Sequence, residues 1–264
     1  ALYDPRGKCL IHCKKLRYFL IGASTDKTFG IEEYATGVKE INNMEGTWRD
    51  AEDGKLSMNP IAQGSVDSTI GIPLAVPAGG SADAYSWMVA GKKWGEVFRV
   101  HQFVHDRKPE TYIKRTGDYW KLWSQKGSRH FPRLPEAVVQ LYYRSLLIIR
   151  TQMSDNGAII AANDGDIMRF ARDTYSYMWP RDGSLVANAL DLSGYSELSR
   201  RFFDFCSNLI SSTGYFLHKY NPDGSLASSW HPWVMDGKLQ HPLQEDETAL
   251  VIWALWKHWD KFRD

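Results

Sequence analysis

Aromatic residues lie beside a charged pair in the segment YSYMWPRDG, residues 175–183, directly before a predicted helix. The guanidinium of Arg181 offers a planar fork of donors, and the carboxylate of Asp182 accepts hydrogen bonds. Together the two side chains can hold the vicinal hydroxyls of a sugar ring, while a neighbouring aromatic face stacks on its C–H groups. A helix-capping Asp182 beside a surface Arg181 explains the same spacing equally well.

Two loops further along the chain also combine polar and aromatic residues. The first, FLHKYNPDG, contains Lys219 and Tyr220 as candidate functional residues, and its Pro-Asp-Gly sequence is a strong turn signal. The second, SSWHPW, spans residues 228–233 and contains Trp230 and Trp233. This loop predicts either an aromatic stacking platform or an aromatic core beneath a loop, and the pattern alone favours neither.

An acidic run, Gln244-Glu245-Asp246-Glu247, precedes a long apolar segment. Carboxylates in the first turn of a helix are stabilised by the helix dipole, and this effect explains at least two of the three acidic residues. A carboxylate in a desolvated pocket also qualifies as a general acid or base. Both interpretations stay open at this point.

Three histidines could in principle bind a metal ion, but their spacing does not support such a site. His218, His231 and His241 match no zinc-binding pattern, and none is paired with another histidine four residues away. The sequence also lacks a glycine-rich phosphate loop and a Gly-x-Ser-x-Gly elbow. We therefore expect neither a metal ion nor a cofactor.

The composition excludes several classes of protein. With 43% hydrophobic and 24% charged residues in 264, the chain can bury a core, and a formal charge of +1 lacks the basic footprint of a nucleic-acid binder. Its apolar runs are too short for a bilayer, so no membrane partner is expected. Cys9, Cys13 and Cys206 form an odd set without Cys-x-x-Cys spacing, which predicts reduced thiols and a cytoplasmic location.

The elements that must position these residues change character along the chain. Residues 1–107 show strand-like alternation and turn signals, which predicts antiparallel β structure. Residues 108–134 are interpreted as a helical linker. Residues 135–264 show helical periodicity. Predicted helices span about 109–125, 135–149, 183–192, 198–209 and 244–256, the last of them apolar on nearly every side.

In chain order, three segments closely resemble glycoside hydrolase family 15, which includes glucoamylases, glucodextranases and prokaryotic trehalases. They are YSYMWPRDG, YFLHKYNPDGSLASSWHPW and LQEDETALVIWAL. The segment GAIIAAND, residues 157–164, resembles the short segment that enters the family's site. The segment AQGSVDSTIGIPL, residues 62–74, resembles part of the β-sandwich domain of prokaryotic members.

This resemblance implies a mixed fold with an antiparallel β-sandwich portion, 1–107, and a helical (α/α)6-barrel portion, 135–264. The four helices after residue 135 would form about a third of the barrel. The resemblance also implies roles in binding substrate. Tyr175 and Trp179 would form the aromatic wall of the innermost subsite, and Arg181 and Asp182 would hydrogen-bond the terminal glucose. Lys219 would contact the substrate, Trp230 would flank the catalytic acid, and, more loosely, Glu245 and Asp246 would lie near the next subsite.

The implied activity is inverting, exo-acting hydrolysis that releases glucose from the non-reducing end of α-glucosides, as in glucoamylases or trehalases. Inversion needs two carboxyl groups roughly 6.5–9.5 Å apart, and in the family both belong to glutamates later in the barrel. We therefore expect no catalytic residue in this chain, inactivity of the chain alone, and a remaining barrel supplied by a longer chain or a partner subunit. The alternative is a noncatalytic glycan-binding or regulatory relative with the same barrel.

Overall fold

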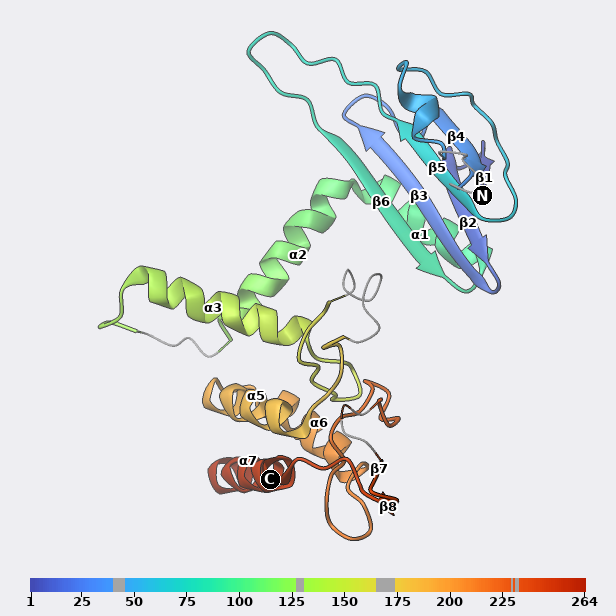
Figure 1. Cartoon of the computed structure of the whole chain (residues 1–264). Helices are drawn as coiled ribbons and strands as arrows, with labels where there is room; N and C mark the ends of the chain where they lie inside the picture. Colours follow the sequence, from blue (N-terminus) through green and yellow to red (C-terminus); the bar gives the residue numbers. More distant parts are fainter. Residues whose placement is uncertain (40–45, 127–130, 165–173, 229, 231–232) are drawn as a thin grey trace. The chain divides into compact units, whose positions relative to one another are not determined.

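A computed structural model describes residues 1–39, 46–126, 131–164, 174–228, 230 and 233–264 (Figure 1). It divides into two compact units, unit 1 from Ala1 to Asp118 and unit 2 from Tyr119 to Asp264. The division falls inside the predicted linker, and the three-part domain scheme stays a prediction. Within the described residues both sheets and helices are present, so the fold is mixed.

Unit 1 is built on a four-stranded antiparallel sheet with the spatial order β1-β2-β3-β6. A second, two-stranded antiparallel sheet pairs β4 with β5. The long β3–β6 pairing runs from Tyr18 opposite Gly91 to Thr25 opposite Ala84. The bounds are β1 Leu2–Asp4, β2 Cys9–Lys14, β3 Arg17–Thr25, β4 Glu33–Val38, β5 Val66–Gly71 and β6 Ala84–Gly91, with a short 3-10 helix at Arg49–Ala51.

The two faces of the larger sheet bury different clusters, as the alternation of side chains along a strand requires. Leu10 and Ala23 pack with Tyr34 of β4 on one face. Ile11 and Leu20 lie on the other face. The antiparallel β expectation is therefore confirmed for these strands, while the β-sandwich assignment stays a prediction.

The expectation of β structure throughout residues 1–107 is wrong at its end, where α1 spans Trp94–Arg107. This helix buries Val97 and His101, four residues apart, against the sheet face that carries Ile11. The His101 ring accepts a hydrogen bond from Trp87 Nε1 at 3.2 Å and lies 3.0 Å from the carbonyl oxygen of Gly7. The helix escaped prediction because a histidine, normally polar, occupies one of its buried positions.

Each of the five predicted helices is present. They are α2 Pro109–Ser124, α3 Glu136–Thr151, α5 Pro180–Leu192, α6 Ser196–Ser207 and α7 Glu245–Phe262, and a small hairpin pairs β7 Val234–Met235 with β8 Lys238–Leu239. The expected start of α5 is wrong, because the helix begins at Pro180 with Trp179 at the N-cap position. Asp182 therefore lies in the first turn and does not cap the helix.

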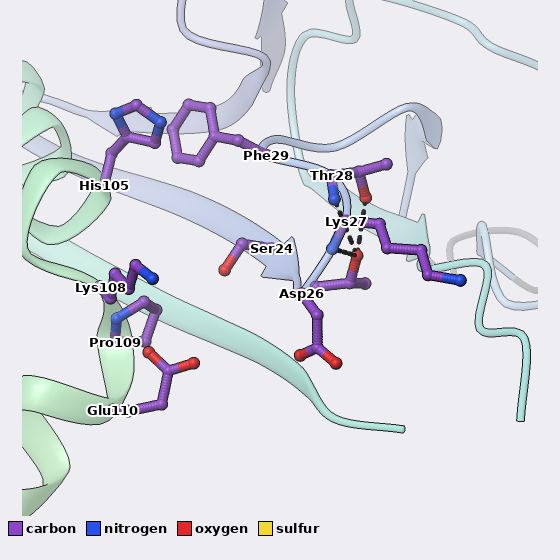
Figure 2. Close-up of a pocket in the computed structure, with 10 residues that line it drawn as sticks. Ser24, Asp26, Lys27, Thr28, Phe29, His105, Lys108, Pro109 and Glu110 are labelled. Carbon is purple, nitrogen blue, oxygen red and sulfur yellow. Dashed lines mark hydrogen bonds between the residues drawn. The ribbon is translucent and has the colours of Figure 1, made fainter. Parts of the chain in front are cut away.

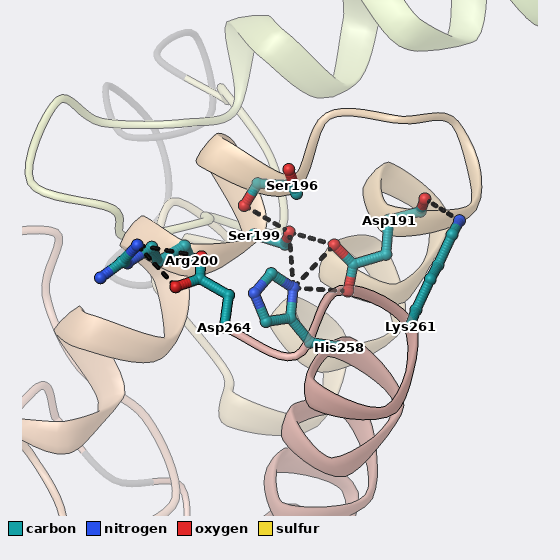
Figure 3. A network of polar contacts seen from close by, with 7 residues as sticks. All are labelled: Asp191, Ser196, Ser199, Arg200, His258, Lys261 and Asp264. Atoms are coloured by element: carbon teal, nitrogen blue, oxygen red, sulfur yellow. Dashed lines mark hydrogen bonds and ion pairs between the residues drawn. The ribbon is translucent and has the colours of Figure 1, made fainter.

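Contacts at both ends show that α5 and α7 run parallel to each other. Arg181, in the first turn of α5, bonds to Gln244 at the start of α7. At the other end, Asp191 in the last turn of α5 meets His258 in the second half of α7. The first turn of α6 approaches the same aspartate through Ser199, so α6 runs antiparallel to both (Figures 1 and 3).

Helix α7 buries only one stripe within the described residues. Its buried positions are Glu247, Val251, Ala254 and His258, which recur at three- and four-residue spacing. Several of its other apolar side chains are exposed, among them Ile252, Trp253, Trp256 and Trp259, so the rest of this apolar helix is not covered by the described residues. In the part of the chain that is described, no helix is both long and apolar enough to cross a membrane.

Candidate functional site

Backbone hydrogen bonds join three loop segments near the N-terminal end of α5. The N–H groups of Ala161 and Ala162 donate to the carbonyls of Tyr177 and Tyr175, at 2.9 and 3.1 Å. Met178 and Tyr220 exchange two bonds of 2.9 Å. The segments GAIIAAND and YSYMW and the loop of Lys219, remote in the sequence, therefore lie side by side.

Asp164 fixes the position of the loop that carries Tyr175. The hydroxyls of Thr174 and Ser176 donate to its carboxylate, and the backbone N–H of Tyr175 donates at 2.7 Å. These donors lower the pKa of Asp164 to about 2. The carboxylate is therefore charged at neutral pH and tethers the backbone beside the aromatic residues.

Three aromatic rings form one cluster at this point. The centroid of Trp179 lies 5.8 Å from that of Tyr175 and 5.6 Å from that of Trp230, and the latter two lie 5.6 Å apart. Trp179 is only 3% exposed, whereas Tyr175 is 56% and Trp230 49% exposed. The outer two rings are thus the ones available for stacking, and Trp179 supports them from behind.

Lys219, a candidate for contact with substrate, lies against the same aromatic cluster from the protein interior. Its side chain is 1% exposed, and Nζ lies 4.1 Å from the ring centroid of Trp230 and 4.2 Å from that of Tyr177. The ring of Trp179 lies 5.5 Å away. An ammonium group over aromatic faces gains cation–π energy, which increases as the site is desolvated.

The polar group of the site forms where α5 and α7 begin. Nη1 of Arg181 donates to Oε1 of Gln244 at 2.8 Å and approaches Oδ2 of Asp246 at 3.4 Å. Nη2 of Arg181 donates to Oδ2 of Asp182 at 3.2 Å. Because both aspartates remain partly open to solvent, their oxygens can accept bonds from a ligand while Arg181 donates to it.

The structure does not bring every predicted residue into the site. Glu245 is exposed, and no hydrogen bond or ion pair ties its side chain to another described residue. Tyr220 is 5% exposed and belongs to the core. Trp233, 38% exposed, lies near His241. Ser229, His231 and Pro232 of the aromatic loop lie outside the described residues.

The sequence patterns did not indicate the supporting roles of Gln244, Tyr177 and His218, and they left Glu247 among several acidic candidates. His218 is 1% exposed, and its Nε2 accepts a bond of 3.3 Å from Trp179 Nε1, so this histidine orients an aromatic ring. Within the described residues, no group of three or more His, Cys, Asp or Glu side chains could hold a metal ion.

Glu247 is the most unusual ionisable group near the site. Its side chain is fully buried, and within the described residues neither carboxyl oxygen has a hydrogen-bond partner. Burial raises its pKa to about 8, against the opposing effect of the positive charge of Arg181. The sequence signal for its burial is its spacing of four and seven residues from Val251 and Ala254, which places all three side chains on one face of the helix.

A separate open pocket of about 470 Å³ lies in unit 1 (Figure 2). The loop Asp26–Phe29 and the junction of α1 and α2 form its lining, and Figure 2 shows His105 next to Phe29. The predicted site residues all belong to unit 2, so this pocket is not part of the candidate site.

Comparison with known proteins finds similarity in sequence and in fold. No family model matches the chain. A stretch of 145 residues, 54% of this chain, is 27% identical to an uncharacterized glycosyl hydrolase of Methanocaldococcus jannaschii, of which it covers 21%. A bacterial glucoamylase complexed with acarbose superposes with a TM-score of 0.54 at 18% identity, over 82% of this chain and 31% of the glucoamylase chain.

The chain therefore spans about a fifth of its curated relative and about a third of the glucoamylase. At this level of identity the second similarity shows the fold alone. The chain is similar in sequence to a glycosyl hydrolase, and its fold is similar to that of part of a bacterial glucoamylase.

Proposed function

We propose that this chain forms the sugar-binding part of a glycoside hydrolase and holds the terminal glucose of an α-glucoside where α5 begins. One observation carries the proposal. The exposed rings of Tyr175 and Trp230 contact Trp179 at the N-cap of α5, and the first turn of the same helix presents Arg181 and Asp182. A stacking surface and a donor–acceptor pair thus lie next to each other at the start of α5, as recognition of a sugar requires.

In this account the outer rings stack on the C–H face of the sugar, backed by Trp179. Arg181 donates to one hydroxyl, and Asp182 accepts from its neighbour. Lys219 supports the aromatic cluster with its ammonium group beneath Trp230. Asp246, on the far side of Arg181, is available for the next sugar unit, and Glu245 contributes only if a ligand reaches its exposed carboxylate.

The similarity to a glycosyl hydrolase and to the glucoamylase fold supports hydrolysis as the reaction of the complete protein. We propose an inverting, exo-acting, glucoamylase- or trehalase-like enzyme of family 15, whose general acid and base glutamates lie outside these residues. The helices α3, α5, α6 and α7 would form about a third of an (α/α)6 barrel, with the parallel α5 and α7 in its inner ring. The remaining helices would come from a longer chain or a partner subunit.

A second candidate is a noncatalytic glycan-binding or regulatory protein. The observation that favours it is the engagement of both Asp182 and Asp246 by one guanidinium. Carboxylates held in this way suit binding, because the guanidinium fixes their oxygens as acceptors for the hydroxyls of a ligand. Glucose release by the complete protein distinguishes the two candidates.

The proposed site is tested by titrating the chain with maltose and following tryptophan fluorescence. Arg181→Ala should weaken binding by on the order of 2–4 kcal/mol, because it removes charge-assisted hydrogen bonds. The matched control is Arg200→Ala, which removes an exposed guanidinium from α6 and should leave the affinity unchanged. Equal affinity for maltose in wild type and Arg181→Ala would overturn the assignment.

A further inference from the structure

Glu247 lies in the first turn of α7, on the stripe that packs against the rest of unit 2. A fully buried carboxyl group whose two oxygens lack hydrogen-bond partners among the described residues is costly. The exposed carboxylates of the same turn, Glu245 and Asp246, carry no such cost. Because Glu247 lies beside the proposed sugar site, we ask what a carboxyl group buried at this expense in free energy does for that site.

The charged and titratable groups that face Glu247 come from three elements. From α5 come the guanidinium and backbone N–H of Arg181, together with the Asp182 carboxylate. Its own helix contributes Asp246, and the loop that follows α6 contributes the phenol of Tyr220. Arg181 therefore interacts electrostatically with three carboxyl groups, and among the described residues its guanidinium is hydrogen-bonded to those of Asp182 and Asp246.

We propose that Glu247 is a positioning residue for Arg181: its buried carboxyl group leaves the guanidinium directed to Asp182 and Asp246 while it is protonated, and competes for that guanidinium once it ionises. The consequence for the sugar rests on the function proposed above. The arrangement of Arg181 itself does not depend on that function.

The physical basis is the difference in solvation among the three carboxyl groups. Asp182 and Asp246 are partly solvated, so water screens their attraction for Arg181. Glu247 is shielded from water, and a charge there would attract the guanidinium through a medium of lower dielectric constant. Burial raises its pKa to about 8, which leaves it protonated at neutral pH and ionised in mildly alkaline solution.

The direct test follows the Cζ resonance of Arg181 by NMR in the chain labelled with [13C]arginine, assigned by its absence in Arg181→Lys. In wild type the resonance should move as the pH rises from about 6 to about 10, with a midpoint near 8. In Glu247→Gln, which keeps the shape of the neutral acid, it should stay in place. In the control Glu197→Gln, which alters an exposed glutamate on α6, it should move as in wild type.

Two results would overturn this role for Glu247: an Arg181 resonance that does not move in wild type, or one that moves equally in Glu247→Gln. The first reading is taken on wild type, so it does not depend on the folding of Glu247→Gln.

Maltose affinity provides the second readout. It should fall several-fold in wild type across the same pH range and remain constant in Glu247→Gln. A moving resonance without maltose binding at any pH would refute the proposed function and leave the positioning of Arg181 supported. Maltose binding with the same pH dependence in both proteins would refute the link between Glu247 and the sugar site.

Discussion

At the scale of residues, Trp179 and Arg181 lie two positions apart, yet different partners hold them. The indole of Trp179 is fixed by His218 and covered by outer rings, whereas the guanidinium of Arg181 is held by Gln244 and two aspartates. This division gives a rigid apolar surface next to a partly solvated polar group. A sugar, with an apolar face and a polar edge, needs both.

The buried carboxyl group of Glu247 predicts a pH dependence of stability. Between pH 4.5, its ordinary pKa, and about 8, its pKa in the folded chain, the folded state keeps a proton that the unfolded state has lost. Stability should therefore fall as the pH rises through this window, by on the order of a few kcal/mol from this group. Urea unfolding of wild type and Glu247→Gln at several pH values checks this, and an identical decline in both would contradict it.

The sequence predicted which residue types meet at the site better than it predicted their burial. Tyr175, Trp179 and Trp230 are found in contact, as an aromatic site requires. The burial of Lys219 was not predictable from its turn-rich loop, because it depends on the pairing of Met178 with Tyr220 across a long stretch of chain.

At the scale of elements, the parallel helices α5 and α7 carry a polar cluster at each end. The open cluster around Arg181 is available to a ligand, whereas the cluster around Asp191 is buried (Figure 3). There the hydroxyl of Ser199 donates to the Asp191 carboxylate, and His258 Nδ1 lies 3.0 Å from Oδ1. Since the serine proton is directed to the aspartate, this cluster joins α5, α6 and α7 and does not activate a nucleophile.

Breaking this buried cluster should destabilise unit 2. His258→Ala removes one hydrogen-bond partner of the buried Asp191 carboxylate, and loss of a hydrogen bond to a buried charged group costs roughly 1.5–3 kcal/mol. The control is Arg200→Ala, which breaks the exposed pair with Asp264 and should cost less than about 1 kcal/mol. Chemical denaturation measures both. Equal small losses would show that the buried cluster contributes no more than a surface pair.

The close contact of α5 with α6 depends on Gly183. A Cβ atom at this position would lie 2.4 Å from Cε2 of Phe202, whose ring is fully buried. Gly183→Ala should therefore destabilise the chain by about 1–3 kcal/mol. Gly117→Ala, in open space on α2, should instead stabilise it by about 0.5–1 kcal/mol through helix propensity. Thermal unfolding tests the pair, and stabilisation by both changes would contradict the packing argument.

Element prediction succeeded where periodicity was carried by apolar residues and failed where polar residues were buried. The helices α3 and α6 follow apolar stripes that end near Gly or polar residues. Helix α1 was missed because His101 occupies a buried position. The predicted start of α5 was wrong because Asp182 has the side chain of a good N-cap residue, whereas the helix begins at Pro180, a residue favoured at the first helical position.

At the scale of the whole molecule, each unit has a hydrophobic core of its own. Leu20 and Val97 belong to a core of unit 1, and Phe202 and Val251 belong to that of unit 2. The proposed site lies entirely in unit 2. Apolar side chains of α7 that remain exposed, such as Trp256, agree with the proposal that further helices cover them in the complete protein.

Separate cores predict separate unfolding. Leu20→Ala should cost about 2–5 kcal/mol in the transition of unit 1 and leave maltose affinity unchanged, because its cavity lies outside unit 2. Phe202→Ala should lower the transition of unit 2 and weaken binding. Calorimetry combined with maltose titration measures both effects. A single transition shifted equally by the two changes would contradict independent units.

The central claim, that the start of α5 binds a terminal sugar, is tested most directly by a crystal structure of this chain with acarbose. We expect the terminal ring to lie against Tyr175 and Trp230, with its hydroxyls within hydrogen-bonding distance of Arg181 and Asp182. A ligand bound elsewhere, such as in the unit 1 pocket beside Phe29, with the start of α5 empty, would contradict the claim.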